Sequence, residues 1–176
     1  MRILIAGLLG GLAMFIWSSA AHMSPLGRVG ISTLPDESAT VANLASAIGD
    51  RGGLYLFPVD MSGTPSSATA PGGFLAYNPH APMAMLPANL IVEFLTETVE
   101  AILAAWLLAQ TALAAYAMRV GFVTVIGIVG AITTNVPYWN WYTFPTAYTL
   151  CYAFIEVVGY LVAGLAIAWY LKPKAA

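Results

Sequence analysis

The chain has 176 residues, of which 60% are hydrophobic and 8% are charged, with a formal net charge of −2 and a mean hydropathy of +0.80. Soluble domains carry about a quarter charged residues, so six basic and eight acidic side chains are too few to cover a water-facing surface. The composition also excludes a disordered chain, which needs high polarity, a disulfide scaffold, because there is one cysteine, and binding of nucleic acid through positive charge. A small polytopic membrane protein remains.

Four apolar runs are long enough to cross a hydrocarbon core as helices, which takes about 20 residues. They cover residues 1–21, 88–110, 120–136 and 148–171. The segments between and after them are 22–87, 111–119, 137–147 and 172–176. The sequence therefore predicts an all-α membrane protein, a bundle of four transmembrane helices in which the long segment 22–87 forms a small extracytoplasmic cap.

Basic residues flank these runs, and such residues prefer the cytoplasmic side of a bacterial-type membrane. One threading places all of them inside, namely Arg2, Arg119, Lys172 and Lys174. We therefore expect a multi-pass protein of the bacterial inner membrane with both termini and the 111–119 turn in the cytoplasm. Residues 22–87 and an aromatic turn at 137–147 are then periplasmic. An alternative for the first run is a cleaved secretory signal of about 20 residues, because small residues follow its apolar stretch.

The cap segment contains local structure signals. Asp36 lies between Pro35 and Glu37, which is a helix-start pattern, and apolar residues then recur at helical spacing up to Gly49. A short amphipathic helix over 36–48 follows. The runs Leu54-Tyr55-Leu56-Phe57 and Phe74-Leu75-Ala76-Tyr77 each come after Gly-Gly and predict the two strands of a β-hairpin.

Four glutamates lie inside apolar runs that contain no lysine or arginine. The three in the second run are spaced i, i+4 and i+7, so they fall within about 60° of one another on a helix. Each run also has a stripe of small and polar residues, which membrane helices use to approach one another closely. We predict a polar interior, open to the outside, lined by Glu93, Glu97, Glu100, Glu156, Ser18, His22 and Tyr152.

A carboxylate in the bilayer costs several kcal/mol, and ionisable groups there are candidates for function. Without a basic neighbour, these glutamates must be protonated, share protons, or meet a cation or a partner's charge. Four interpretations stay open: polar contacts between helices, proton or cation conduction, contact with a partner subunit or cofactor, and a catalytic metal.

Two further groups of residues are candidate sites. Imidazole and thioether groups suit copper in an oxidising compartment, so copper or another divalent metal is considered at His22, His80, Met83 and Met85. The second group is an aromatic belt at the outer interface or a lid for a lipid-soluble ligand, formed by Tyr138, Trp139, Asn140, Trp141 and Tyr142. The sequence carries no phosphate-loop, dinucleotide, zinc-protease or serine-hydrolase motif, and no residue is assigned a catalytic role.

Several stretches resemble a group of small bacterial inner-membrane proteins that have no assigned function. These stretches are Phe15-Ile16-Trp17-Ser18 with His22, the segment 53–58, and the segment 136–142 with Phe144-Pro145. The resemblance implies a bacterial source and four spans, and it implies no activity.

The leading hypothesis is a non-catalytic membrane protein whose carboxylate-lined interior binds or passes a proton or small cation, alone or as a homo-oligomer. The second is an accessory subunit that docks on a larger membrane complex. The third is an enzyme with a metal held by Glu93, Glu97, Glu156 and His22. In each case the expected surroundings are the lipid bilayer, with no nucleic acid.

Overall fold

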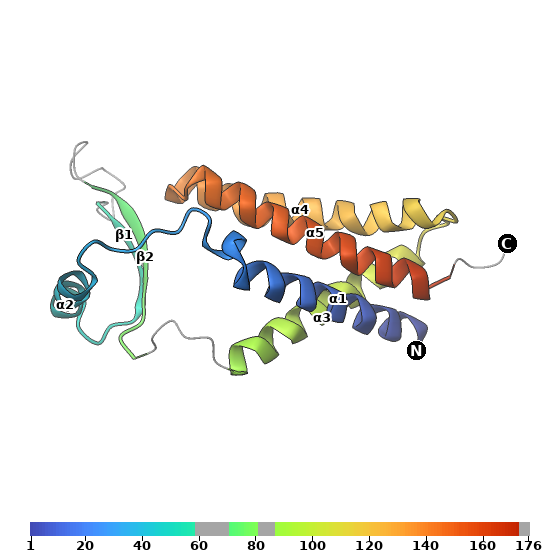
Figure 1. Cartoon of the computed structure of the whole chain (residues 1–176), viewed down its shortest axis with the longest axis horizontal. Helices are drawn as coiled ribbons and strands as arrows, with labels where there is room; N and C mark the ends of the chain where they lie inside the picture. Colours follow the sequence, from blue (N-terminus) through green and yellow to red (C-terminus); the bar gives the residue numbers. More distant parts are fainter. Residues whose placement is uncertain (59–70, 81–86, 173–176) are drawn as a thin grey trace.

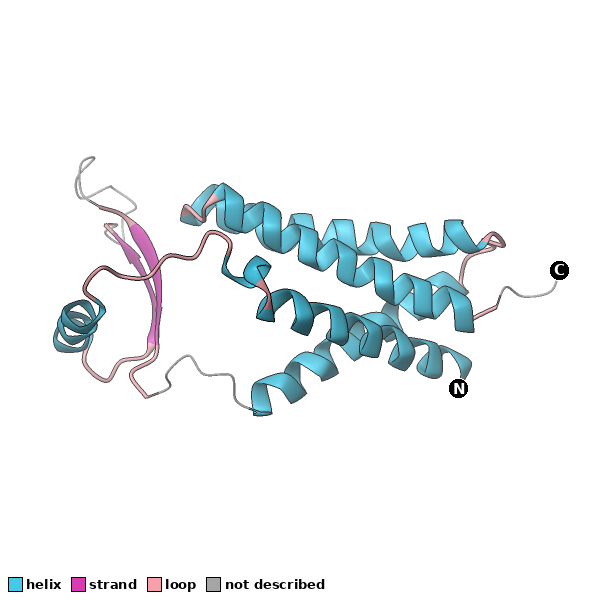
Figure 2. Ribbon diagram, viewed as in Figure 1, coloured by secondary structure: helices cyan, strands magenta, loops and turns pink. Residues whose placement is uncertain are grey.

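Four long helices form one end of the molecule, and a small cap forms the other (Figure 1). The computed structural model describes residues 1–58, 71–80 and 87–172. In chain order its elements are α1 (Arg2–Met23), η1 (Pro25–Arg28), α2 (Glu37–Ile48), β1 (Gly53–Phe57), β2 (Gly73–Tyr77), α3 (Pro87–Ala109), α4 (Tyr116–Tyr142) and α5 (Thr146–Tyr170). Figure 2 shows that the described part is helical except for one hairpin.

Three of the long helices, α1, α4 and α5, are long and apolar enough to cross a membrane. The shortest has 22 residues, about 33 Å at 1.5 Å per residue. The 23 residues of α3 give a similar length, but three glutamates lower its apolar character. Length and composition therefore support a membrane protein with three candidate spans in the described chain.

The expected aromatic turn at 137–147 is wrong for its first half, because α4 continues through Pro137 to Tyr142. Proline is tolerated in membrane helices where neighbouring groups compensate for its missing N–H. The helix ends instead at Thr143, which has a left-handed conformation with φ 58. The backbone N–H of Thr143 and that of Phe144 both donate to the carbonyl of Tyr138, so this helix end satisfies a carbonyl that would otherwise lack a partner within the helix.

The four long helices pack chiefly as neighbours in a row. The strongest packing joins α4 to α5, while α1 packs against both α3 and α5. By contrast, α3 makes few contacts with α4 or α5, and in Figure 1 its first half points away from them. The order across the row is therefore α3, α1, α5, α4.

Small residues allow the close approach of α1 and α3. A side chain at Gly7 would clash with Ile102, and a Cβ on Gly11 would lie 2.6 Å from the Cα of Thr98. The buried core between α1, α3 and α5 is correspondingly rich in alanine, with Ala6, Ala101, Ala104, Ala105, Ala163 and Ile167 among its members. Membrane helices lack a hydrophobic driving force between them, so such close packing is a main source of their association.

We expected Arg119 to lie in the turn 111–119. In the structure it belongs to the first turn of α4 and is buried, with 4% of its surface exposed. Its guanidinium donates to the carbonyls of Ala168 and Leu171 at the end of α5. Those carbonyls have no partner within their own helix, and a positive charge is favourable at a helix C-terminus. Arg119 thus joins the start of α4 to the end of α5.

The cap contains the helix and hairpin expected for it. The Asp36 side chain accepts a hydrogen bond from the Ala39 N–H (3.0 Å) at the start of α2, and β1 pairs antiparallel with β2 from Gly53 opposite Tyr77 to Phe57 opposite Gly73. The cap joins the helices through rings, because Phe74 of β2 packs on Tyr142 of α4 with centroids 4.9 Å apart. In Figure 1 it lies at the end of the helices opposite the start of α1 and the end of α5.

Replacing Gly11 by alanine should lower the free energy of unfolding by about 1–3 kcal/mol, because the added Cβ meets the backbone of α3, which cannot move aside without shifting the helix. The measurement is equilibrium unfolding in mixed detergent micelles. The matched control is Gly121→Ala on α4, where a Cβ meets nothing within 4 Å. Equal stability of the two variants would contradict the close α1–α3 contact.

Candidate functional site

The four glutamates have different surroundings in the folded chain. Glu97 is buried, with 6% of its surface exposed, whereas Glu100 and Glu156 are half-buried and Glu93 is exposed. Three of the four are thus withdrawn into the row of helices. Glu97 and Glu156 each lie ten residues after the start of their helix, about 15 Å from its cap-side end.

Glu156 on α5 is held by α4. Its Oε2 accepts hydrogen bonds from the Thr134 hydroxyl at 3.1 Å and from the Asn135 amide at 3.0 Å. Its Oε1 occupies the space beside Gly130, where an added Cβ would lie 2.8 Å away. Two neutral donors and a missing side chain on α4 therefore accommodate this carboxyl group.

Glu100 on α3 is linked to α5. The Tyr160 hydroxyl donates to Glu100 Oε2 at 3.3 Å, and the Tyr160 ring fills the space beside Gly127 of α4. Glu100 also lies close enough to Glu156 for the two carboxyls to interact electrostatically. Tyr160 thus connects α3 to the α4–α5 pair, with which α3 otherwise makes few contacts.

Glu97 is the least satisfied of the four. Ser18 of α1 lies beside it, with its hydroxyl donated to the Phe15 carbonyl at 3.2 Å, and Glu93 and Glu100 are its acidic neighbours. Its Oε2 is buried without a hydrogen-bond partner in the described chain, as is the hydroxyl oxygen of the adjacent Thr98. A buried, unpaired carboxylate oxygen is costly, and a proton on the group or a bound cation removes that cost.

We call these residues the carboxylate cluster: Glu97, Glu100, Glu156, Ser18, Thr134, Asn135 and Tyr160. All four long helices contribute to it. The hydrogen-bonding partners in it are hydroxyls and an amide, and Arg119 is bound to carbonyls of α5 instead. The cluster can therefore bind a proton or a cation, and none of its members carries a positive charge.

Two residues predicted for the polar interior, His22 and Tyr152, lie at its cap side. The His22 ring packs edge-on against the Tyr152 ring at 5.4 Å, and its Nδ1 is 2.8 Å from the Ser18 carbonyl. The Tyr152 hydroxyl donates to the Gly27 carbonyl at 3.4 Å. Both residues therefore hold η1 and the end of α1 against α5, at the cap side of the carboxylate cluster.

The described residues predicted to bind a metal do not come together in the structure. Among the described residues, no group of three His, Cys, Asp or Glu side chains comes together in a way that could hold a metal ion. His80 lies in the loop after β2, where its N–H donates to the Asn78 side chain. Met83 and Met85 lie outside the described residues.

The aromatic residues predicted as a belt or lid occupy the last turns of α4. Trp141 is 75% exposed, and the Trp139 indole donates to the Thr146 hydroxyl at 3.0 Å across the turn. Tyr138 and Tyr142 belong to a continuous chain of ring contacts that runs from Phe74 through Phe144, Tyr148 and Tyr152 to His22. Asn140 is exposed. The rings thus tie the cap to α1, α4 and α5.

Sequence reasoning left three members out of the candidate site, namely Tyr160, Thr134 and Asn135. Tyr160 had a usable signal, because it lies one turn after Glu156 on the same face. Thr134 and Asn135 had a weaker one. Two adjacent polar residues near the end of an apolar run are common, and their pairing with Glu156 depends on the register between α4 and α5.

A double-mutant cycle tests the α4–α5 part of the carboxylate cluster. Thr134→Val and Glu156→Ala should show a coupling energy of about 0.5–2 kcal/mol in unfolding measurements, the range found for hydrogen bonds between membrane helices. The control cycle uses Thr133→Val, because the Thr133 hydroxyl donates to carbonyls of its own helix. Coupling as large with Thr133 would contradict the assigned contact.

No family model, curated protein or solved structure matches this chain. The functional assignment therefore has to come from the residues and contacts described above.

Proposed function

We propose that this is a four-span inner-membrane protein whose carboxylate cluster binds and releases protons from the cap side. The observation that carries the proposal is Glu97, a buried carboxyl with one oxygen that has no hydrogen-bond partner in the described chain. Intramembrane carboxyl groups of this kind typically serve proton or ion pathways.

Two observations favour α3 as the fourth span. Its 23 residues match the other long helices in length, and it packs along α1. Its buried side chains include Glu97 together with Ala101, Ala104, Ala105 and Leu108. Because Glu97 and Glu100 are turned toward α1 and α5, the bilayer would meet chiefly the apolar side of the helix.

The distribution of basic residues supports the orientation. Arg2, Arg119 and Lys172 gather at the end of the helices opposite the cap, where α1 begins and α5 ends (Figure 1). Positive residues favour the cytoplasmic side. The cap is then periplasmic, and the chain ends are cytoplasmic.

The composition of the cluster favours a proton over a metal cation. Divalent cations such as Ca²⁺ take six to eight oxygen ligands, whereas the described glutamates do not assemble a group of three. A proton needs one carboxyl oxygen, and Glu97 Oε2 offers it. The donors to Glu100 and Glu156 are neutral, so they stabilise these carboxyls without supplying the missing positive charge.

Access from the cap side follows from exposure along the helices. Glu93 is exposed one turn before Glu97 on α3, and Thr134 is exposed beside Glu156. Toward the other end, the packed core consists of small apolar residues such as Ala104, Ala105 and Ile167. Protons would therefore exchange between the cluster and the periplasm, and the apolar half of the row would block a continuous path.

Infrared spectroscopy of the purified protein at neutral pH tests this function. The carbonyl band of protonated carboxyl groups should be present and should lose intensity in Glu97→Gln, because glutamine keeps the shape but carries no exchangeable acid proton. The control is Glu37→Gln, which removes an exposed carboxyl from cap helix α2. Absence of the band from the unmodified protein, or an unchanged band in Glu97→Gln, would refute the proposal.

One observation favours the accessory-subunit alternative. Because α3 ends the row, its outer side is uncovered, and exposed Val92, Leu95 and Val99 share that helix with exposed Glu93. A partner helix there would cover Glu93 and these apolar side chains. A photo-crosslinker at Val92, compared with one at exposed Val129 of α4, should give a single defined adduct in native membranes if this reading holds.

A further inference from the structure

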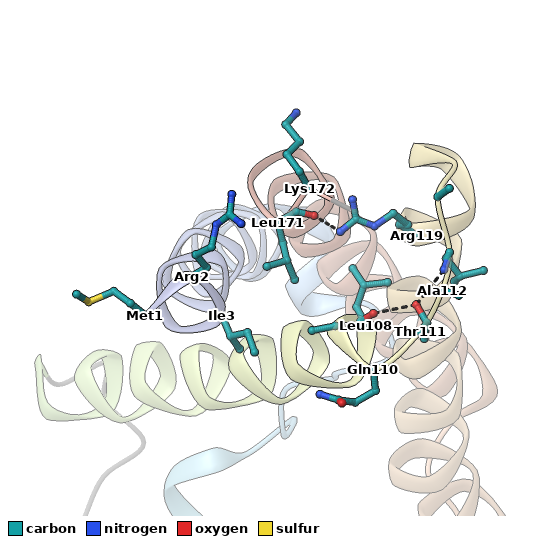
Figure 3. Close-up of a pocket in the computed structure, with 13 residues that line it drawn as sticks. Met1, Arg2, Ile3, Leu108, Gln110, Thr111, Ala112, Arg119, Leu171 and Lys172 are labelled. Atoms are coloured by element: carbon teal, nitrogen blue, oxygen red, sulfur yellow. Dashed lines mark hydrogen bonds between the residues drawn. The ribbon is translucent and has the colours of Figure 1, made fainter. Parts of the chain in front are cut away.

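A second polar site lies at the end of the helices opposite the cap. A pocket of about 830 Å³ opens there between the ends of the long helices. Figure 3 shows three cationic side chains around it, Arg2 from α1, Arg119 from α4 and Lys172 from the residues after α5. Segments far apart in the sequence thus bring positive charge to one place.

Among the described residues that line the pocket, no acidic side chain neutralises this charge. All the residues that line the pocket are described, and none of them is an aspartate or glutamate. Arg119 is turned onto the α5 carbonyls, whereas Arg2 and Lys172 are exposed. Two exposed cationic residues therefore line the pocket together with a third, Arg119, that is buried.

The rest of the lining is largely apolar. Ile3, Leu108, Leu113 and Leu171 form part of the wall, and Gln110 and Thr111 add polar groups at the end of α3. A volume of this size is typical of small-molecule sites, which cover about 300–1,000 Å³. A ligand with an anionic head and an apolar body matches both the charge and the lining.

We propose that this pocket binds the phosphate headgroup of an anionic phospholipid. Three observations carry the proposal: the convergence of three cations, the absence of acids among the lining residues, and the apolar wall next to them. Basic pockets between membrane helices on the cytoplasmic side bind anionic headgroups by this chemistry. A free phosphate ion would use the cations alone and leave the apolar wall without a partner.

The test measures lipid retention by the full chain in detergent micelles, using native mass spectrometry with phosphatidylglycerol and phosphatidylcholine as probes. Phosphatidylglycerol should be retained preferentially. The variant R2Q/K172Q should bind it roughly tenfold more weakly, because each surface cation contributes to attraction of anionic lipid. The matched control is R28Q/R51Q, which removes two exposed arginines from the cap side.

Arg119 is left unchanged because it holds α4 to α5, and the melting temperature of each variant without lipid shows whether the fold is kept. If R2Q/K172Q is unstable, the single variants R2Q and K172Q should each show part of the loss. Equal retention of the two lipids, or undiminished retention by the variants, overturns the proposal. If inorganic phosphate were retained as well as phosphatidylglycerol, the pocket would be assigned to a free anion. That result would also overturn the proposal.

Discussion

The structure depends on how three carboxyl groups are kept in an apolar environment without a basic neighbour. Hydroxyl and amide groups solve this problem for two of them: Tyr160 for Glu100, and Thr134 with Asn135 for Glu156. Glu97 lies beside Ser18 and keeps one oxygen without a hydrogen-bond partner in the described chain. Each of these contacts joins two helices. The need to satisfy the carboxyls therefore also holds together a row in which α3 has little direct packing on α4 and α5.

Glycines make those short polar contacts feasible. Gly11 brings the backbone of α1 against Thr98, the neighbour of Glu97, while Gly127 receives the Tyr160 ring and Gly130 the Glu156 carboxyl. Serine, threonine and asparagine side chains are short, so they reach a carboxyl on another helix only where the backbones approach closely. Small residues and acidic residues are thus parts of one arrangement, because the first determine the helix spacing that the second require.

The sequence predicted the elements better than their arrangement. Helical spacing placed Glu97 and Glu100 on one face, and the cap helix and hairpin lie within a residue of their expected ranges. The prediction that a helix ends before Pro137 was wrong. A proline inside an apolar run can end a membrane helix or lie within it, and the sequence alone does not distinguish the two cases. His22 and Tyr152 were both predicted for the interior, and their rings contact each other at the cap side of the carboxylate cluster. Packing order and register between helices arise from contacts distant in sequence, so periodicity could not supply them.

The carboxylate cluster suits a positively charged ligand, and the basic pocket suits a negatively charged one. The two regions lie at opposite ends of the same apolar core. The carboxylate cluster faces the cap-side half, the basic pocket lies at the chain termini, and small apolar residues such as Ala105, Ala163 and Ile167 separate them. Under the proposed function, this separation has a physical consequence. Anchoring of the basic end by anionic lipid fixes the orientation of the row, and the cluster then exchanges protons with the cap side alone. A path through the core would require α3 to move relative to α1, and the close contacts at Gly7 and Gly11 oppose that movement.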